Sequence, residues 1–166
     1  MKHMLADYAR YNLWANDRLI NLFRTTKDEL IEQPIISSFP SVRQTVLHIW
    51  DAESLWLDRL NDNSPTVFPS TTFTGSNTEA FNNVIASSTA LLQFVENRPA
   101  PFFRERKKIM TLKGGEYQEL VTDMVHHCLN HSTFHRGQLV TMCRQLGITH
   151  IPATDFIFYK RESRQK

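Results

Sequence analysis

This sequence has few of the residues that define disulfide-rich, collagen-like or low-complexity chains, with two cysteines, five glycines and seven prolines. Both cysteines, Cys128 and Cys143, fall within a segment that we predict to be one helix. The fifteen residues that separate them span about 22 Å of helix, whereas a disulfide joins Cα atoms within roughly 7 Å. The two thiols therefore cannot pair there, and we expect them to be buried and reduced, as in a cytoplasmic protein.

Long apolar runs and an excess of charge are also lacking. No stretch approaches the roughly eighteen apolar residues of a transmembrane helix, and Asp7, Arg10 and Asp17 interrupt what would be the apolar core of a signal peptide. Nineteen basic against seventeen acidic residues leave a net charge of +2, far short of the basic surface that nucleic-acid binding usually needs. We therefore expect a soluble protein with no membrane and no nucleic-acid partner.

What the sequence does contain is hydrophobic periodicity. Apolar side chains recur every three or four residues in four segments, which predicts amphipathic helices over residues 4–23, 42–60, 77–97 and about 117–146. Little strand signal accompanies them. The predicted fold class is therefore all-α, a four-helix bundle that residues 1–166 form as a single domain. Bundles of this kind build metal and ligand sites on facing helices.

The helix ends and the connections carry their own signals. Capping-box patterns begin at Ser41 and Ser76, before the second and third helices, and Gly147 is expected to end the fourth helix in the left-handed conformation. Residues 61–75 have no helical period, which predicts a long crossover connection. Residues 102–117 predict an irregular segment or a short hairpin, and the tail, which begins apolar, should pack back onto the bundle.

Histidines are concentrated on one face of the fourth predicted helix. His127, His131 and His135 follow one another at intervals of four residues, and Gln138 and Met142 share their face. A single histidine on an apolar face is usually a hydrogen-bonded core residue. Several together favour a metal site, because neighbours four residues apart on a helix are close enough for two imidazoles to reach one cation.

An HxxxH pair fills only two of the three protein positions of a catalytic zinc site, so a further ligand must come from another element. His48 in the second helix is the best candidate, because His3 lies near the N-terminus and His150 lies beyond the end of the fourth helix. Periodicity alone, however, places His48 at the margin of its helix's apolar face. The pattern by itself would describe it as a half-exposed histidine.

Several motifs together resemble the DinB/YfiT-like family of proposed metalloenzymes. The segment from His131 to Gln138, HSTFHRGQ, resembles the family's HxxxHRGQ signature. The resemblance spans nearly the whole chain, in order and at plausible spacing. It also includes NLWAN at residues 12–16, His48 with Glu53 and Trp56–Leu57, and Leu146–Gly147 followed by Pro152 and Asp155–Phe156.

This resemblance implies a four-helix bundle with one long crossover, often dimeric, and one divalent cation held by His48, His131 and His135. His127 matches no ligand of the family pattern and is interpreted as a pocket-lining or core residue. Gln138 and Met142 are predicted to line the same pocket. Some family members are thiol S-transferases or isomerases that use a low-molecular-weight thiol. The resemblance therefore implies a metal-dependent enzyme of thiol S-transferase or small hydrolase type that acts on a small molecule. The alternative is a non-catalytic protein in which the ion is structural.

Zinc fits a set of three imidazoles best, and nickel is the second choice. The sequence lacks the HExxH motif of metalloproteases and the GxSxG motif of serine hydrolases, which lowers the rank of peptidase chemistry. Glu53 lies within the apolar face of its helix, where a carboxylate needs a partner. The residues leave two roles open for Glu53: a contact to an imidazole or to a transferred proton at the pocket, or an interhelical pair with Arg136 or another arginine.

The expectation of a homodimer comes from the family resemblance. Apolar residues outside the main stripes of the first and fourth helices give indirect support, because one bundle does not obviously cover them; they are Leu13, Phe23, Phe134 and Val140.

Overall fold

The computed structural model describes residues 1–165 and is mainly helical. Four long helices account for most of it, α1 (Lys2–Arg24), α3 (Val42–Leu60), α4 (Asn77–Asn97) and α5 (Val121–Gln145). Two short helices, α2 (Asp28–Glu32) and α6 (Phe156–Ser163), and two 3-10 turns, Pro69–Thr72 and Ala100–Arg104, lie in the connections. One antiparallel hairpin joins β1 (Arg106–Met110) to β2 (Glu116–Leu120). The predicted all-α fold class is confirmed.

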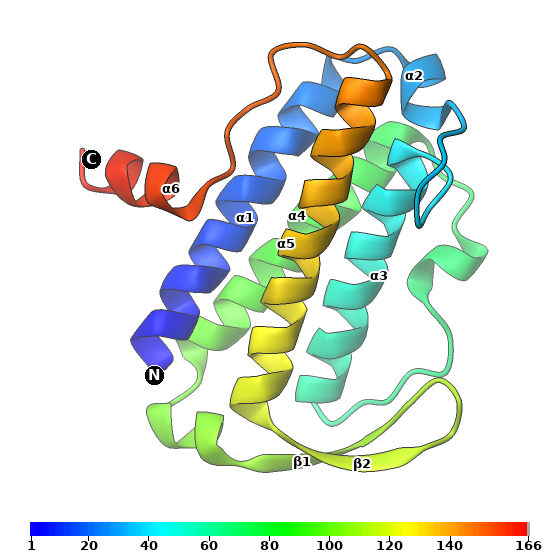
Figure 1. The fold of residues 1–166 in the computed structure, drawn as a ribbon. Helices are drawn as coiled ribbons and strands as arrows, with labels where there is room; N and C mark the ends of the chain where they lie inside the picture. Colours follow the sequence, from blue (N-terminus) through cyan, green and yellow to red (C-terminus); the bar gives the residue numbers. More distant parts are fainter. Residues whose placement is uncertain (166) are drawn as a thin grey trace.

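The four long helices form one bundle, in which α1 and α5 run in one direction and α3 and α4 in the other (Figure 1). Both α1 and α3 pack against α4 and α5. Because α3 and α4 are parallel, the chain between them, residues 61–76, must return along the length of the bundle. This is the predicted long crossover.

The N-terminal ends of the helices follow the predicted capping chemistry. The Ser41 side chain accepts a hydrogen bond from the Gln44 backbone N–H, and Ser76 and Glu79 form a complete capping box at the start of α4. At the other end of α5, Gly147 adopts a positive φ of 71°, the left-handed conformation that was expected.

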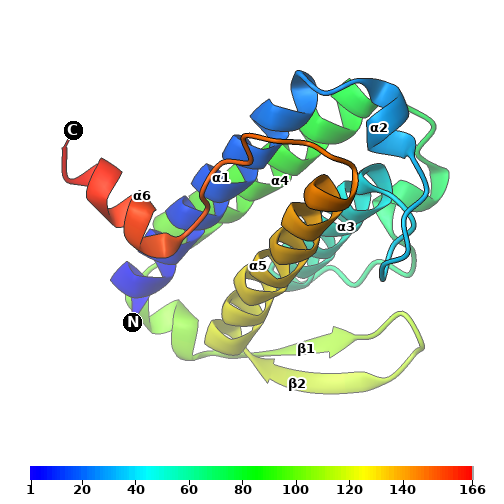
Figure 2. The ribbon, with the colours of Figure 1, turned by 45° about the horizontal axis from the view of Figure 1, so that its top comes forward.

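The start of the last long helix differs from the prediction. Residues 117–120, which were expected to be helical, belong to β2 and pair with β1, so that Leu120 lies opposite Arg106. The hairpin forms one end of the molecule, below α3 and α5 (Figure 2). Helical periodicity continues through Leu120 and Met124, so the pattern alone could not show that strand pairing ends at Leu120 and that the helix begins at Val121.

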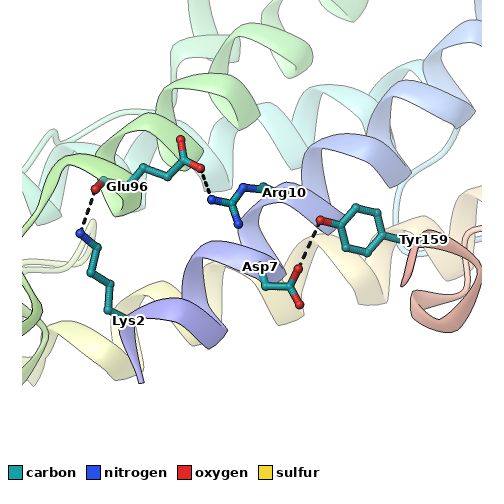
Figure 3. Close-up of polar contacts among 5 residues, drawn as sticks. All are labelled: Lys2, Asp7, Arg10, Glu96 and Tyr159. Atoms are coloured by element: carbon teal, nitrogen blue, oxygen red, sulfur yellow. Dashed lines mark hydrogen bonds and ion pairs between the residues drawn. The ribbon is translucent and has the colours of Figure 1, made fainter. Parts of the chain in front are cut away.

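The C-terminal segment packs back on the bundle, as predicted. On α6, Tyr159 is buried against Tyr11 and Trp14 of α1, and its hydroxyl donates a hydrogen bond to Asp7 (Figure 3). The same view shows Arg10 of α1 paired with Glu96 of α4, and Lys2 donating to the Glu96 backbone carbonyl. These contacts attach α1 to α6 on one side and to α4 on the other.

Two apolar clusters fill the bundle, one toward each end. The first includes Leu60, Phe103 and Val121 near the hairpin, and the second includes Phe23 and Ile49 near α2. Both cysteines are buried and free, and burial raises the pKa of the Cys143 thiol to about 11. No helix within residues 1–165 has the length and apolar character that a membrane span requires.

The four apolar residues singled out as outside the main stripes do not behave alike. Phe23 is only 1% exposed and lies in the core, so that interpretation of Phe23 is wrong. Leu13 and Val140 are half-buried. Phe134 is 62% exposed and projects from α5.

Candidate metal centre

Three histidines from two antiparallel helices meet at one point. His48 comes from α3, and His131 and His135 lie one turn apart on the face of α5 that packs against α3. Their ligand atoms lie within 4.8 Å of one another. The His131 Nε2 atom is 3.2 Å from His48 Nε2 and 3.1 Å from His135 Nε2. His48, whose position periodicity left open, therefore lies beside the His131 and His135 pair.

Proton counting shows that these nitrogens suit a cation. The His135 Nδ1–H donates to the Gln138 side-chain oxygen at 2.8 Å, which leaves a lone pair on Nε2 of the neutral ring. His131 Nδ1 is buried and has no hydrogen-bond partner within residues 1–165. If a neutral His131 ring carries its proton on Nε2, this N–H can donate a hydrogen bond to His48 or to His135, but not to both. The other Nε2···Nε2 contact is then not a hydrogen bond.

A divalent ion removes this conflict by accepting all three lone pairs. Metal–nitrogen bonds of about 2.0–2.1 Å in a tetrahedral zinc site place adjacent nitrogens about 3.3–3.4 Å apart. The two observed separations that involve His131, 3.1 Å and 3.2 Å, are close to that value. The three-histidine cluster could thus bind a divalent metal.

The electrostatic surroundings keep these imidazoles neutral. Burial, followed by the charge of neighbouring histidines, lowers the pKa of His48 and of His131 to about 4. Burial also lowers the pKa of His135, against an opposing effect of its hydrogen bond to Gln138. At neutral pH all three rings are unprotonated, which is the form that binds a metal.

Two loops cover the cluster, and the sequence contained no signal for their role. Phe39, from the segment between α2 and α3, stacks on His48 with ring centroids 4.2 Å apart and meets the edge of His135 at 5.6 Å. Phe68, from the crossover, approaches His48 at 6.4 Å. The neighbouring Ser38 accepts a hydrogen bond from Gln138. Loop residues have no periodicity, so only the three-dimensional structure could find them.

The other residues predicted for the pocket lie in different surroundings. Gln138 accepts the hydrogen bond from His135 Nδ1 and so orients the His135 ring. Met142 is buried in the apolar cluster near α2, where its sulfur accepts a hydrogen bond from Thr45. His127 is exposed one turn before His131, with its ring 5.9 Å from the His131 ring and 4.8 Å from the Trp56 ring. It lines a separate cavity beside the cluster.

Glu53 lies at the centre of a buried polar network between the two apolar clusters. Its side chain is fully buried, and both carboxylate oxygens accept hydrogen bonds. None of the donors is one of the three histidines of the cluster. The donors come from α1, α4 and α5: Asn12, Asn16 and Ser132 to Oε1, and Ser87 and Ser88 to Oε2.

Arg136 completes this network from α5. It is only 2% exposed and donates to the side-chain oxygens of Asn12 and Asn16 at 2.6 and 2.9 Å. Among the ion pairs of residues 1–165, none joins Arg136 directly to Glu53. The two asparagine amides bridge the two charges instead. Arg136 is thus the arginine partner of Glu53, through two amides and not through a direct ion pair, and the network connects all four long helices. A role of Glu53 in proton transfer stays a prediction.

Comparison with known proteins agrees with this architecture. The family model described as "DinB family" matches residues 1–166. The chain is 26% identical over 174 aligned residues to Protein DinB of Bacillus subtilis (strain 168), and the match covers 93% of this chain and 95% of that protein. Since the family model spans the whole sequence, the chain belongs to the DinB family.

Proposed function

We propose that this protein is a metal-dependent enzyme that acts on a small molecule at a divalent ion held by His48, His131 and His135. The convergence of three neutral Nε2 atoms on one point carries this proposal. Zinc is the first choice of metal because it favours imidazole ligands in three-histidine sites, and nickel is the second.

The reaction that we propose is thiol S-transfer, with hydrolysis of a small substrate as the second candidate. A divalent ion with three neutral ligands keeps its full charge and an open position, where it lowers the pKa of a bound thiol or water. Gln138 holds the His135 ring in the tautomer that directs Nε2 into the site. Phe39 covers the His48 ring and limits access of water from that side.

The alternative is that the ion only clamps α3 to α5. The network around Glu53 argues against the need for such a clamp, because Ser132 already ties α5 to the Glu53 carboxylate on α3. Two apolar clusters also hold these helices together. We therefore expect the metal-free protein to stay folded at neutral pH, which a purely structural ion would not allow.

Elemental analysis of protein purified without a histidine tag is the direct test of the metal. We expect one divalent ion per chain. The zinc-loaded protein should then be screened for transfer of small thiols to electrophiles and for hydrolysis of small amides and esters. A folded metal-free form together with activity only in the loaded form supports the enzyme. An unfolded metal-free form without any activity of the loaded form supports the clamp.

We also propose that the chain forms a homodimer. Phe134 on α5 and the apolar residues Ile157 and Phe158 on α6 are exposed in the single chain. Exposed aromatic side chains of this size are common at the centres of protein interfaces. A two-fold arrangement would allow each patch to be covered by a second copy.

A further inference from the structure

One short segment, between α2 and α3, covers two of the three histidines of the candidate metal centre. The ring of Phe39 stacks on His48 with 4.2 Å between ring centroids and meets the edge of His135 at 5.6 Å. The adjacent Ser38 hydroxyl accepts a hydrogen bond from the Gln138 side chain at 2.9 Å. Displacement of this one segment therefore uncovers two ligands of the same ion together.

The segment is anchored at both ends and loosely held between them. Ile35 packs on the apolar cluster near α2, and its backbone N–H donates to the Pro40 carbonyl at 2.8 Å, which closes a loop of residues 35–40. Between these ends Ile36 is completely exposed. No backbone group of residues 36–39 forms a hydrogen bond with another residue from 1 to 165. Segments with few buried contacts and an unbonded backbone open locally at low free-energy cost.

The crossover, which carries the other aromatic ring near the cluster, is held more firmly. Two residues beyond Phe68, Ser70 donates to the carboxylate of Asp51 through its backbone N–H at 2.9 Å and through its hydroxyl at 2.5 Å. Asp51 is buried and follows His48 by three residues on α3. Hydrogen bonds to a carboxylate are roughly twice as strong as neutral ones, and the loop of residues 35–40 has only a neutral one to α5. Of the two covering segments, this loop is the one that opens more easily.

We propose that residues 35–40 form a lid whose opening gives access to the three histidines, and that Phe39 is the residue that closes it. This inference rests on the proposed function, because it concerns exchange at a metal bound there. The lid controls the rate at which an ion enters and leaves the site. A substrate that has to reach the open position of the metal passes the same lid.

Opening the lid breaks contacts that the empty and the metal-bound site share. The stack of Phe39 on His48 and the hydrogen bond from Gln138 to Ser38 join side chains of the protein alone. The hydrogen bond from His135 Nδ1 to Gln138 lies within α5 and stays intact, so this ligand keeps its orientation while the lid moves. Loss of the Phe39 ring then destabilises the closed form equally with and without the ion. It speeds entry and release by the same factor and leaves the affinity unchanged.

The experiment measures two rates on the full-length protein by stopped-flow mixing with a colorimetric zinc indicator. These are the association rate of zinc with the metal-free protein and the rate of zinc release to excess chelator. Phe39→Ala is the test variant. Phe68→Ala is the matched control, because it removes the same ring from the firmly held crossover. His127→Ala opens the end of the cluster nearest the hairpin, where the His127 ring lies 5.9 Å from the His131 ring.

We expect Phe39→Ala to raise both rates by about twofold to tenfold, the range that one aromatic pair contributes, with an unchanged equilibrium affinity. Misfolding cannot speed association. Phe68→Ala should change neither rate.

Three results would overturn the lid while the metal site stands. They are unchanged rates in Phe39→Ala, faster release without faster association, and a larger acceleration in His127→Ala than in Phe39→Ala. The second result would mean that the ring only stabilises the bound ion, and the third that the ion enters from the hairpin end. If the wild-type protein binds no zinc, the metal-dependent function fails, and this inference fails with it.

Discussion

Replacing Glu53 by alanine should lower the free energy of unfolding by about 3–5 kcal/mol, the usual cost of removing one member of a buried charge network. The carboxylate accepts from five side chains. Two of the donors keep another acceptor, since Ser87 also donates to the Val84 carbonyl and Asn16 to the Ser88 hydroxyl. The side-chain donor groups of Asn12, Ser88 and Ser132 lose their acceptor when the carboxylate is removed. A buried unsatisfied donor costs about 1–3 kcal/mol, so the loss of three acceptors alone accounts for at least about 3 kcal/mol, the lower end of this range.

Urea unfolding of metal-free protein, followed by circular dichroism, measures this loss. Glu53→Gln keeps the shape of the side chain but removes the charge that balances Arg136, and its NH2 group faces other donors. We therefore expect a loss for Glu53→Gln that is also above 1 kcal/mol. Glu29→Ala, at an exposed site on α2, should stay within about 0.5 kcal/mol of the wild-type protein. A loss below 1 kcal/mol for Glu53→Ala, with an unchanged m-value, would refute the view that this network holds the helices together.

Three further predictions concern the metal, pH and assembly. Most of the bound zinc should be lost in each of the single variants His48→Ala, His131→Ala and His135→Ala, whereas the control His127→Ala should retain it. Full zinc occupancy in His48→Ala would contradict the proposed ligand set. Since the pKa values of His48 and His131 are about 4 in the folded metal-free protein and about 6.5 when unfolded, the unfolded chain takes up protons first. Stability should therefore fall as pH drops from about 6.5 toward 4, and urea midpoints at pH 7.0, 5.5 and 4.5 that show no such fall would contradict these assignments. Sedimentation equilibrium at micromolar concentration should show a dimer that Phe134→Ser weakens. A single species at the 19.4 kDa monomer mass would reject the dimer.

The long helices could be predicted from the sequence because their burial follows a simple period. Each packs one face on the core, and the capping residues Ser41 and Ser76 mark where two of them begin. The boundary at Val121 was missed for the opposite reason. Residues 117–120 fit a helical period and a strand equally well, and only pairing with residues 106–110 selects the strand.

The candidate site was predictable only in part from local pattern. His131 and His135 stand in register on one helix, so their proximity follows from helical geometry. His48 is 83 residues away from His131 in the sequence. The apolar periodicity of residues 42–60 predicts only that His48 is a half-exposed residue at the margin of the helix. The family resemblance, and not the pattern of α3, indicated its role. Phe39 and Phe68 lie in loops whose path depends on the packing of the whole bundle, so nothing in their local sequence pointed to the site.

The two asparagines of α1 show why the centre of this bundle is polar. Asn12 and Asn16 lie one turn apart and are almost fully buried, although asparagine is a poor helix former. An amide is neutral and carries both a donor and an acceptor, so each residue donates to Glu53 and accepts from Arg136. Leucine would leave both charged groups without these partners, and aspartate would place a second carboxylate against Glu53. The chain thereby places opposite charges in the bundle without direct contact between them, and attaches α1 to the two helices that carry the histidines. The geometry of the three-histidine cluster thus rests on contacts among the protein's own side chains, which is the arrangement expected of a site whose proposed metal has to exchange its other ligands and still stay in place.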